Sequence, residues 1–534
     1  MPSSASRQTT EIVSSRTSRA AAGWDCADWV DPSDRYRPDR ERPEKRRQFS
    51  WLGWRPLWDS RNDKIARRRW IGDSTDYERT RWVKAQRRLG IDPDLPITRY
   101  RNQENVSFMV LGDPGEGDDS QYQVLSPLHE KAKGTDFTYI VSDVIYPAGD
   151  AREYEDKFAY PYRELPGPIY AVPGNHDWYD GLHGFMTLLC GADPDQRPPV
   201  HPSRNRLKRA FLDLTWREAS EEFQADLERM KRHRPEPSGQ PASYFAIELK
   251  ELVLVGIDTG IQSGIDADQG EWLRKMSKLP KDKILLTGKP LIVDASRKRC
   301  PIGGSTDPRE SVNAIVEDPA NRYIAVIGGD IHNYQRYPVA QPDGRVVQHI
   351  VSGAAGAYTK ATHTIPKATV ESCGCDEDDF RCYPRRGDSL AAYSLLLNRW
   401  VPGYDVVIPP EVAPAVMSLR LDNVVDPTRI EDRDKQVPKD MWRKAKVVFP
   451  ISHAGILGPF NTYFSELLDW NEPPPPLFKS FLKVETRPGE IEIRCFAATG
   501  CAKHAKDPPL EDHIRATRGD DGNWTWEVLL DPPE

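Results

Sequence analysis

Four short polar segments, each directly after an apolar run, constrain the fold of this chain most strongly. The polar segments are Gly112–Gly115, Asp143–Tyr146, Gly174–Asp177 and Gly329–His332. The apolar runs before them are Val106–Leu111, Phe137–Val141, Ile169–Val172 and Tyr323–Ile327. Such β-branched runs are typical of buried strands in a sheet covered on both faces. Because ligands of open α/β sheets bind beyond the carboxyl ends of strands, we expect the four polar segments to meet at one site.

The side chains of these segments predict the chemistry of that site. Carboxylate, amide, phenol and imidazole groups that converge at one sheet edge suit hard or borderline cations. One such polar segment after a strand arises easily by chance, but four do not. The sequence therefore predicts a metal site.

The order of the four segments resembles the calcineurin-like metallophosphoesterase superfamily, and most closely its purple acid phosphatase branch. Like that branch, the chain has GDxG at Gly112–Gly115 and a tyrosine, Tyr146, three residues after Asp143. The segment Gly329–Arg336 matches the pattern GHxHxYxR except at its first histidine, where Asp330 stands.

The resemblance implies an α/β (α+β) fold, a four-layer sandwich of two mixed β-sheets flanked by helices. It covers roughly residues 105–355. The alternating runs Phe481–Glu485 and Ile491–Ala497, separated by a Pro-Gly turn, predict a hairpin that returns to the edge of the core sheet.

Length predicts further units around that core, because 534 residues exceed one average domain. We expect a helix at Tyr77–Leu89 and a helical insertion at about 200–235. The predicted units are a disordered leader (1–22), a Trp/Arg-rich N-terminal extension (23–103), the core (104–356), a large C-terminal insertion or specificity region (357–475), and a closing hairpin with a tail (476–534).

The resemblance implies two metals that share one bridging aspartate, here Asp143. The first metal would be held by Asp113, Asp143, Tyr146 and His332. A phenolate is a good ligand for Fe(III), because a hard, highly charged cation drives off the phenol proton. We therefore expect iron at the site that contains Tyr146.

The second metal position departs from the family pattern. It would take Asp143, Asn175 and two histidines, but Gly288-Lys289-Pro290 stands where one histidine is expected. Asp330 replaces the other. One interpretation is a weak site for Mn²⁺, Mg²⁺ or Zn²⁺ with Asp330 as a ligand. The other is a mononuclear centre in which the Lys289 ammonium stands in the place of the second cation and binds a phosphate.

Other residues offer alternative metal ligands. His183 or His363 could complete an ordinary two-metal centre. A separate structural zinc could be held by three cysteines and a fourth ligand, either Cys300 or His363. The alternative is that these cysteines are free, as is usual in a reducing compartment. The three cysteines are Cys373, Cys375 and Cys382.

Four residues are predicted to act on the substrate. His176 would face it and protonate the leaving alkoxide or stabilise transition-state charge. Asp177 could fix the tautomer of His176, or it could cap the following helix. Lys289 and Arg336 are the predicted substrate-binding cations. The polar loop at 295–320 is a candidate substrate lid.

Composition and targeting signals limit the partners. A net charge of −7 and a pI near 6.0 give no general polyanion-binding signature. The extension mixes Arg and Trp, which could bind nucleic acid, but its acidic residues favour ion-paired packing against the core. No apolar run approaches the roughly 20 residues of a membrane helix. The first 22 residues lack an apolar signal core, so we expect a cytoplasmic protein, whereas purple acid phosphatases are commonly exported.

The expected function is hydrolysis of a phosphomonoester or related phosphoester by attack of a metal-bound hydroxide. The expected partner is a small phosphorylated substrate, without nucleic acid or membrane and with a possible homo-oligomer. Two other classes stay open. One is a mononuclear or iron-dependent tailoring enzyme that acts on a non-phosphate metabolite, and the other is a catalytically silent binding protein.

Overall fold

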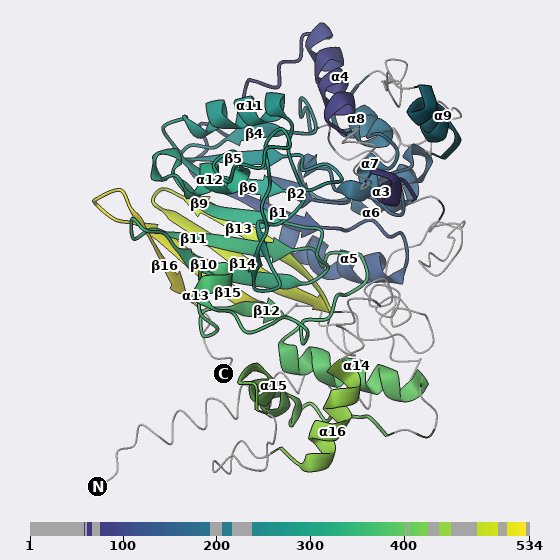
Figure 1. The fold of residues 1–534 in the computed structure, drawn as a ribbon. Coiled ribbons are helices and arrows are strands. Elements are labelled where there is room, and N and C mark those ends of the chain that lie inside the picture. The colour runs from purple at the N-terminus through teal and green to yellow at the C-terminus, as the bar shows by residue number, and fades with distance from the viewer. Residues whose placement is uncertain are drawn as a thin grey trace.

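The structure is a computed structural model of the whole chain (Figure 1). The residues that it describes are 58, 61–66, 75–192, 206–215, 236, 238–400, 403, 405–424, 437–449, 478–499 and 510–529. The predicted leader at 1–22 and most of the predicted helical insertion at 200–235 lie outside these residues.

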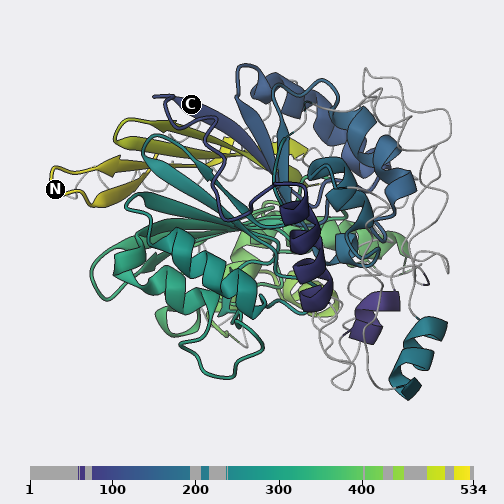
Figure 2. The ribbon, with the colours of Figure 1, turned by 90° about the horizontal axis from the view of Figure 1, so that it is seen from above.

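Two seven-stranded mixed sheets form the centre of the molecule (Figure 2). The first has the order β16 (Trp524–Val528), β15 (Leu510–Arg518), β14 (Glu490–Thr499), β13 (Lys479–Arg487), β1 (Val106–Gly112), β2 (Phe137–Val141) and β3 (Ile169–Val172). The second has the order β12 (Arg381–Tyr383), β10 (Tyr334–Ala340), β11 (Val346–Ser352), β9 (Tyr323–Gly328), β6 (Asp282–Thr287), β5 (Leu252–Ile257) and β4 (Phe245–Glu248).

Alternate residues of β1 show why the sheets are stacked. Phe108 and Val110 belong to a buried cluster that also includes residues of the second sheet, such as Leu286. Met109 and Leu111 belong to another cluster on the opposite face of β1. Because successive strand residues point to opposite faces, β1 is buried on both sides.

Helices cover the outer faces and complete the four layers. On the first sheet, α5 (Asp119–Ala132) contacts β13 and β14. On the second, α11 (Ala267–Ser277) contacts β5 and α12 (Val312–Glu317). The predicted fold class is confirmed.

The C-terminal strands enlarge the first sheet. As predicted, the β13–β14 hairpin returns to the core, and β13 pairs antiparallel with β1. The segment predicted as a tail is not one throughout, since β15 and β16 add two further antiparallel strands. In β15 the charged Asp512 interrupts the alternation of Leu510, Ile514 and Ala516, so its pattern carried little strand signal. The alternation of β16 is regular, and this strand was missed.

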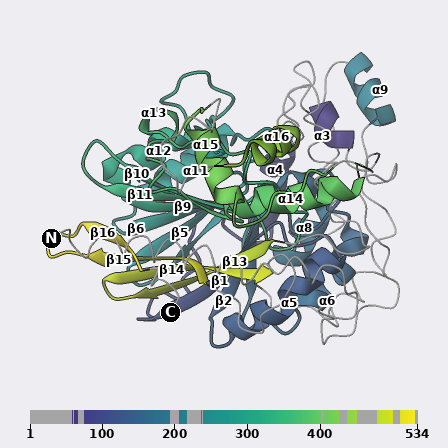
Figure 3. The ribbon, with the colours of Figure 1, turned by 90° about the horizontal axis from the view of Figure 1, so that it is seen from below.

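The region predicted as an insertion has two parts. Its β12 strand pairs with β10 and therefore belongs to the second sheet. Beyond it, three helices contact one another and lie together on the underside of the sheets (Figure 3). These helices are α14 (Arg386–Trp400), α15 (Ala413–Leu421) and α16 (Lys439–Val448).

Part of the N-terminal extension packs on the core through α3 (Arg61–Ala66) and α4 (Thr75–Arg88). The helix α4 agrees with the predicted one. Its Arg79 is buried and forms ion pairs of 2.9 Å with Asp258 and 2.5 Å with Asp266. The indole of Trp82 is buried and donates a hydrogen bond to the Gly181 carbonyl at 2.9 Å. These contacts agree with ion-paired packing against the core.

Among the described residues, no helix has both the length and the apolar character needed to cross a membrane.

Candidate active site

The phenol of Tyr146 is the meeting point of the four residues predicted at the first metal. Its oxygen lies 3.1 Å from Asp113 Oδ1, 3.0 Å from Asp143 Oδ2 and 3.1 Å from His332 Nε2. All four side chains are buried. They follow β1, β2 and β9, so the carboxyl ends of three strands supply the cluster.

The backbone at these strand ends is constrained. Asp113, Ser142 and Asp330 have φ angles of 55°, 75° and 67°, which non-glycine residues rarely adopt. The amide of Asp330 donates to Asp113 Oδ2 at 2.8 Å and thereby ties β9 to β1. A Cβ at Gly174 would lie 2.1 Å from Asp143 Oδ1, so only glycine allows this close approach. Unusual conformations of this kind persist where surrounding contacts determine them.

The electrostatics of the cluster favour a bound cation. Burial, followed by the charges of Asp143 and Asp330, raises the pKa of Asp113 well above its ordinary value. Burial also raises the pKa of Asp143. Burial, followed by the Lys479 charge, lowers the pKa of His332 to about 3 and keeps its imidazole neutral, as a metal ligand requires. A cation at this point would favour the ionised carboxylates.

The donor set fits a metal ion in its chemistry. Two carboxylates, a phenol and a neutral imidazole suit iron or another hard to borderline cation. Among the described residues, no group of three or more His, Cys, Asp or Glu side chains is arranged to hold a metal ion. In this structure Tyr146 stands between the carboxylates and the imidazole, so the phenol is part of the donor set.

Lys289 and Asp330 meet at the position predicted for the second metal. Lys289 Nζ lies 3.3 Å from Asp330 Oδ1. The amide of Asn175 donates to the Tyr179 hydroxyl at 2.7 Å. A Cβ at Gly288 would lie 2.6 Å from the Pro173 carbonyl oxygen, so this position cannot carry the family's histidine without a backbone shift.

The alternative metal ligands that the sequence offered, His183 and His363, lie outside the Tyr146 cluster. The His183 ring stacks near Trp82 at 6.4 Å between ring centroids, and His363 Nδ1 lies 2.8 Å from Ser389 Oγ. Neither lines the cavity described below. Cys373 and Cys375 have their sulfur atoms 3.8 Å apart, whereas Cys300 lines the cavity. Among the described residues no group of three such side chains could hold a metal ion, and the three cysteines are free, which is the alternative that the sequence left open.

His176 is positioned by backbone groups. Its amide donates to Asp143 Oδ1 at 2.7 Å, and its Nδ1 lies 2.6 Å from the Pro147 carbonyl oxygen. A carbonyl only accepts hydrogen bonds, so Nδ1 carries a proton and Nε2 is the atom that can exchange one.

Asp177 does not orient His176, which corrects one predicted role. Its Oδ2 accepts hydrogen bonds of 3.0 Å from the amides of Val144 and Gly174. Burial, followed by the Asp143 charge, raises the pKa of Asp177 to about 8. Asp177 thus caps the short helix α7 (Asn175–Trp178), the structural alternative that the sequence left open.

Arg336 does not reach the site, and its predicted role in substrate binding is wrong. The guanidinium is buried and lies 2.5 Å from Asp512 Oδ2, which also accepts a hydrogen bond of 2.7 Å from the Tyr334 hydroxyl. Its position on β10 directs it between the sheets, so it links β10 to β15.

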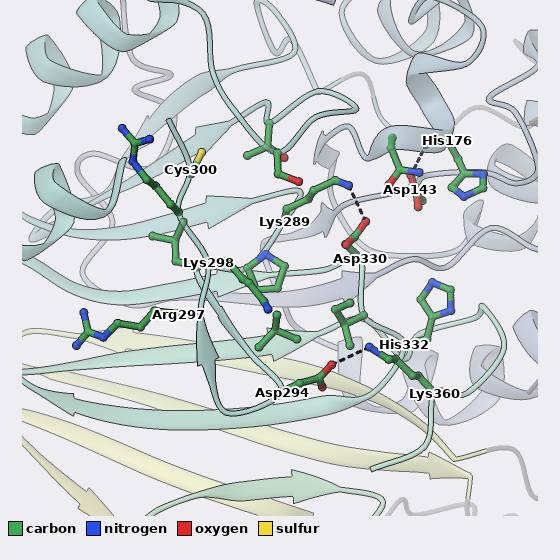
Figure 4. A pocket seen from close by; sticks show the side chains of 18 of the residues that line it. Asp143, His176, Lys289, Asp294, Arg297, Lys298, Cys300, Asp330, His332 and Lys360 are labelled. Carbon is green, nitrogen blue, oxygen red and sulfur yellow. Dashed lines mark hydrogen bonds and ion pairs between the residues drawn. The ribbon is translucent and has the colours of Figure 1, made fainter. Parts of the chain in front are cut away.

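A cavity of about 670 Å³ opens beside the cluster (Figure 4). Asp143, Tyr146, Asn175, His176, Lys289, Asp330 and His332 all line it. The sequence indicated a lid at 295–320, and Arg297–Cys300 do line the cavity. It missed Asp294, Tyr358 and Lys360, which also line it. No motif marks these three residues, although Lys360 follows shortly after the glycine-rich end of β11.

Comparison with known families agrees with the motifs. Residues 106–334 match the model of the calcineurin-like phosphoesterase family. They form a calcineurin-like phosphoesterase domain. This domain holds every residue placed around Tyr146, and the family implies a metal centre. No curated protein matches the chain.

Three solved structures are similar to the chain at low identity. Purple acid phosphatase PPD1 from yellow lupin (Lupinus luteus) seeds has 9% identity and a TM-score of 0.37, with 79% of this chain and 55% of that chain covered. The chain thus spans about half the length of the lupin protein. PhoD has 9% identity and a TM-score of 0.37, with 82% and 73% covered. GAP50, the anchor in the inner membrane complex of Plasmodium, has 12% identity and a TM-score of 0.30, with 52% and 77% covered.

Proposed function

We propose that this protein is a metal-dependent hydrolase of a phosphomonoester or a related phosphoester. The observation that carries the proposal is the convergence of Asp113, Asp143 and His332 on the Tyr146 phenol, within a calcineurin-like phosphoesterase domain. The adjoining cavity supports it, because it gives a substrate access to this cluster.

Asp113, Asp143, Tyr146 and His332 would hold the first metal, with Asn175 and Asp330 at the second position. When bound, a metal neutralises phosphate charge and lowers the pKa of a water molecule. The four first-site residues would fix the place of that charge, because all are buried and the other three contact the Tyr146 phenol. Phosphoryl transfer depends mainly on such positioning and charge neutralisation.

At the second position we favour the mononuclear interpretation. The ion pair between Lys289 and Asp330 supports it, because the ammonium already supplies a positive charge beside the carboxylate. Lys289 would then bind a phosphate oxygen as a point charge. The same observation favours a second candidate function, a mononuclear iron enzyme that acts on a non-phosphate metabolite.

His176 would act on the leaving group. The Pro147 carbonyl holds Nδ1 protonated and fixes the ring at the wall of the cavity. In its imidazolium form, His176 can then donate the Nε2 proton to the departing alkoxide, and the neutral ring takes a proton back from the attacking water.

Metal analysis combined with a visible spectrum and a phosphatase assay tests the proposal. We expect about one tightly held iron per chain, a tyrosinate charge-transfer band that Tyr146→Phe removes, and release of phosphate from 4-nitrophenyl phosphate. Lys289→Ala should lower turnover without changing the tightly held metal. Iron and colour without hydrolysis of any ester in a broad panel would favour the second candidate function. Two tightly held metals per chain would contradict the mononuclear centre.

A further inference from the structure

We propose that the cavity wall formed by Asp294, Lys298 and Lys360 binds a second anionic group of the substrate, so that the preferred substrate is a phosphoester with another phosphate or a carboxylate. This inference rests on the proposed function for the identity of the first group. The three residues, named here the basic wall, line the same cavity as the Tyr146 cluster.

The basic wall begins at a tight turn. Asp294 and Ala295 lie between β7 (Ile292–Val293) and β8 (Ser296–Arg297), with φ angles of 50° and 53°. Two successive left-handed residues make the turn that favours Asn and Gly in hairpins. Neither residue here is glycine, so other contacts must hold the turn.

Side chains of β10 provide those contacts. Gln335 Oε1 accepts from the Asp294 amide at 2.9 Å, and Gln335 Nε2 donates to Asp294 Oδ1 at 3.0 Å. The Tyr337 hydroxyl accepts from the Ala295 amide at 2.9 Å and donates to Gln335 Oε1 at 2.6 Å. The turn is therefore fixed by a buried hydrogen-bonded network, as a binding site requires.

Lys360 joins this wall to the metal cluster. Its ammonium donates to Asp294 Oδ2 at 2.9 Å, and its amide donates to the His332 carbonyl at 2.9 Å. The Asn333 side chain donates to the Lys360 carbonyl at 3.3 Å. Lys360 is thus placed by the residues next to the first metal position, and its charge is balanced by Asp294.

Lys298 supplies the uncompensated charge. Its amide donates to the Leu291 carbonyl at 2.8 Å, and its carbonyl accepts from Asn313 Nδ2 at 3.0 Å, so its backbone is fixed. Neighbouring Arg297 pairs with Glu317 at 2.5 Å. In the described part of the chain, no carboxylate lies within 4.0 Å of the Lys298 ammonium. In Figure 4 its side chain extends from the loop toward the region between Asp294 and Asp330.

Charge decides what this wall can bind. Lys298 and Lys360 carry two positive charges against the one negative charge of Asp294, which leaves the wall net positive. In Figure 4 Asp143 and His176 lie apart from Asp294 and Lys298, whereas Lys360 lies next to His332. A phosphate at the metal cluster would therefore leave Asp294 and Lys298 for a second group of the substrate. An ammonium in such a cavity binds phosphate or carboxylate by charge-assisted hydrogen bonds.

Steady-state kinetics with three substrates test the proposal. Glycerol 3-phosphate has one anionic group, 3-phosphoglycerate adds a carboxylate, and fructose 1,6-bisphosphate adds a phosphate. We expect kcat/KM to be higher for the substrates with two anionic groups. Lys298→Gln should lower kcat/KM roughly 10- to 100-fold for those substrates and less than about twofold for glycerol 3-phosphate, as expected for a charged hydrogen bond. Lys298→Arg should restore most of the loss.

The matched control is Lys278→Gln, which removes the same charge from an exposed lysine at the end of α11, outside the cavity. It should leave all three values of kcat/KM unchanged. An equal loss on all three substrates in Lys298→Gln, or no preference in the unchanged protein, would overturn the second anionic site. A preference only for fructose 1,6-bisphosphate or only for 3-phosphoglycerate identifies the second group as phosphate or carboxylate.

A binding measurement separates this inference from the proposed function. Calorimetry with propane-1,3-bisphosphonate and propylphosphonate needs no hydrolysis. Tighter binding of the bisphosphonate, lost in Lys298→Gln, together with no hydrolysis of any ester, would refute the hydrolase and keep the second anionic site. Hydrolysis of glycerol 3-phosphate, with no Lys298-dependent preference in either measurement, would support the hydrolase and refute the second anionic site.

Discussion

The two walls of the cavity are held in place in different ways. The Tyr146 cluster consists of buried side chains that follow central strands, and each contacts the same phenol oxygen. The basic wall consists of half-buried Asp294 and Lys360 and exposed Lys298, which lie on a hairpin turn and two loops. Its ion pair between Lys360 and Asp294 has side chains that are 30% and 33% exposed.

This difference separates two kinds of role. In the cluster, the buried side chains contact one phenol and act on the same bound charge. Removal of one carboxylate therefore changes the environment of every other side chain in the cluster. In the basic wall, water screens the charges, and a substitution changes one contact, so its effect depends on whether the substrate has a second anionic group. We therefore expect the cluster to determine whether the reaction occurs and the basic wall to determine which substrate is preferred.

The largest effect is expected from Asp143→Asn. Asp143 contacts Tyr146 and the His176 amide, so it links the metal position to the proposed acid. Its carboxylate is a proposed ligand of the metal, and the amide removes its charge while keeping its shape. Metal content and turnover should fall together, with kcat at least about 10⁴-fold lower, because charge neutralisation is the main source of rate enhancement. Metal content by elemental analysis and turnover on 4-nitrophenyl phosphate are the measurements. Unchanged metal stoichiometry would refute the ligand assignment.

A smaller loss is expected from His176→Ala. This variant should keep its metal and lose about 10²–10⁴-fold in kcat on an alkyl phosphate, the usual contribution of general acid–base catalysis. The loss should be smaller on 4-nitrophenyl phosphate, because a nitrophenolate leaves without a proton. Parallel assays of the two esters provide the comparison. Equal losses on both esters would exclude His176 as the acid.

The same contrast explains how much of the site could be predicted from sequence. The ligands of the cluster directly follow strands, so strand periodicity alone places Asp113, Asp143 and His332 at one edge. Lys298 and Lys360 follow no such rule, because their positions depend on the β7–β8 turn and on contacts with β10 and the His332 backbone. Their recognition requires the tertiary structure.

Arg336 shows a different limit. The motif places it in line with His332, but strand alternation on β10 decides which way its side chain points. The structure directs it to Asp512 on β15, a strand that weak alternation did not predict. The motif therefore led to a wrong substrate-binding role for Arg336, and the missing strand hid the partner that fixes it.

The smallest effect, and the one that sharpens the comparison most, is expected from Asp294→Asn. Asparagine adopts the left-handed conformation of residue 294 as readily as aspartate and can still accept a hydrogen bond from Gln335, so the turn should persist. The substitution removes the negative charge that balances Lys360. The basic wall then becomes more positive, and KM for fructose 1,6-bisphosphate should fall about two- to fivefold, the value of one partly exposed charge pair. KM for glycerol 3-phosphate and the thermal midpoint of unfolding should change little.

A higher KM for fructose 1,6-bisphosphate would mean that Asp294 itself contacts the substrate, and the basic wall would then recognise a hydroxyl or a cation instead of an anion.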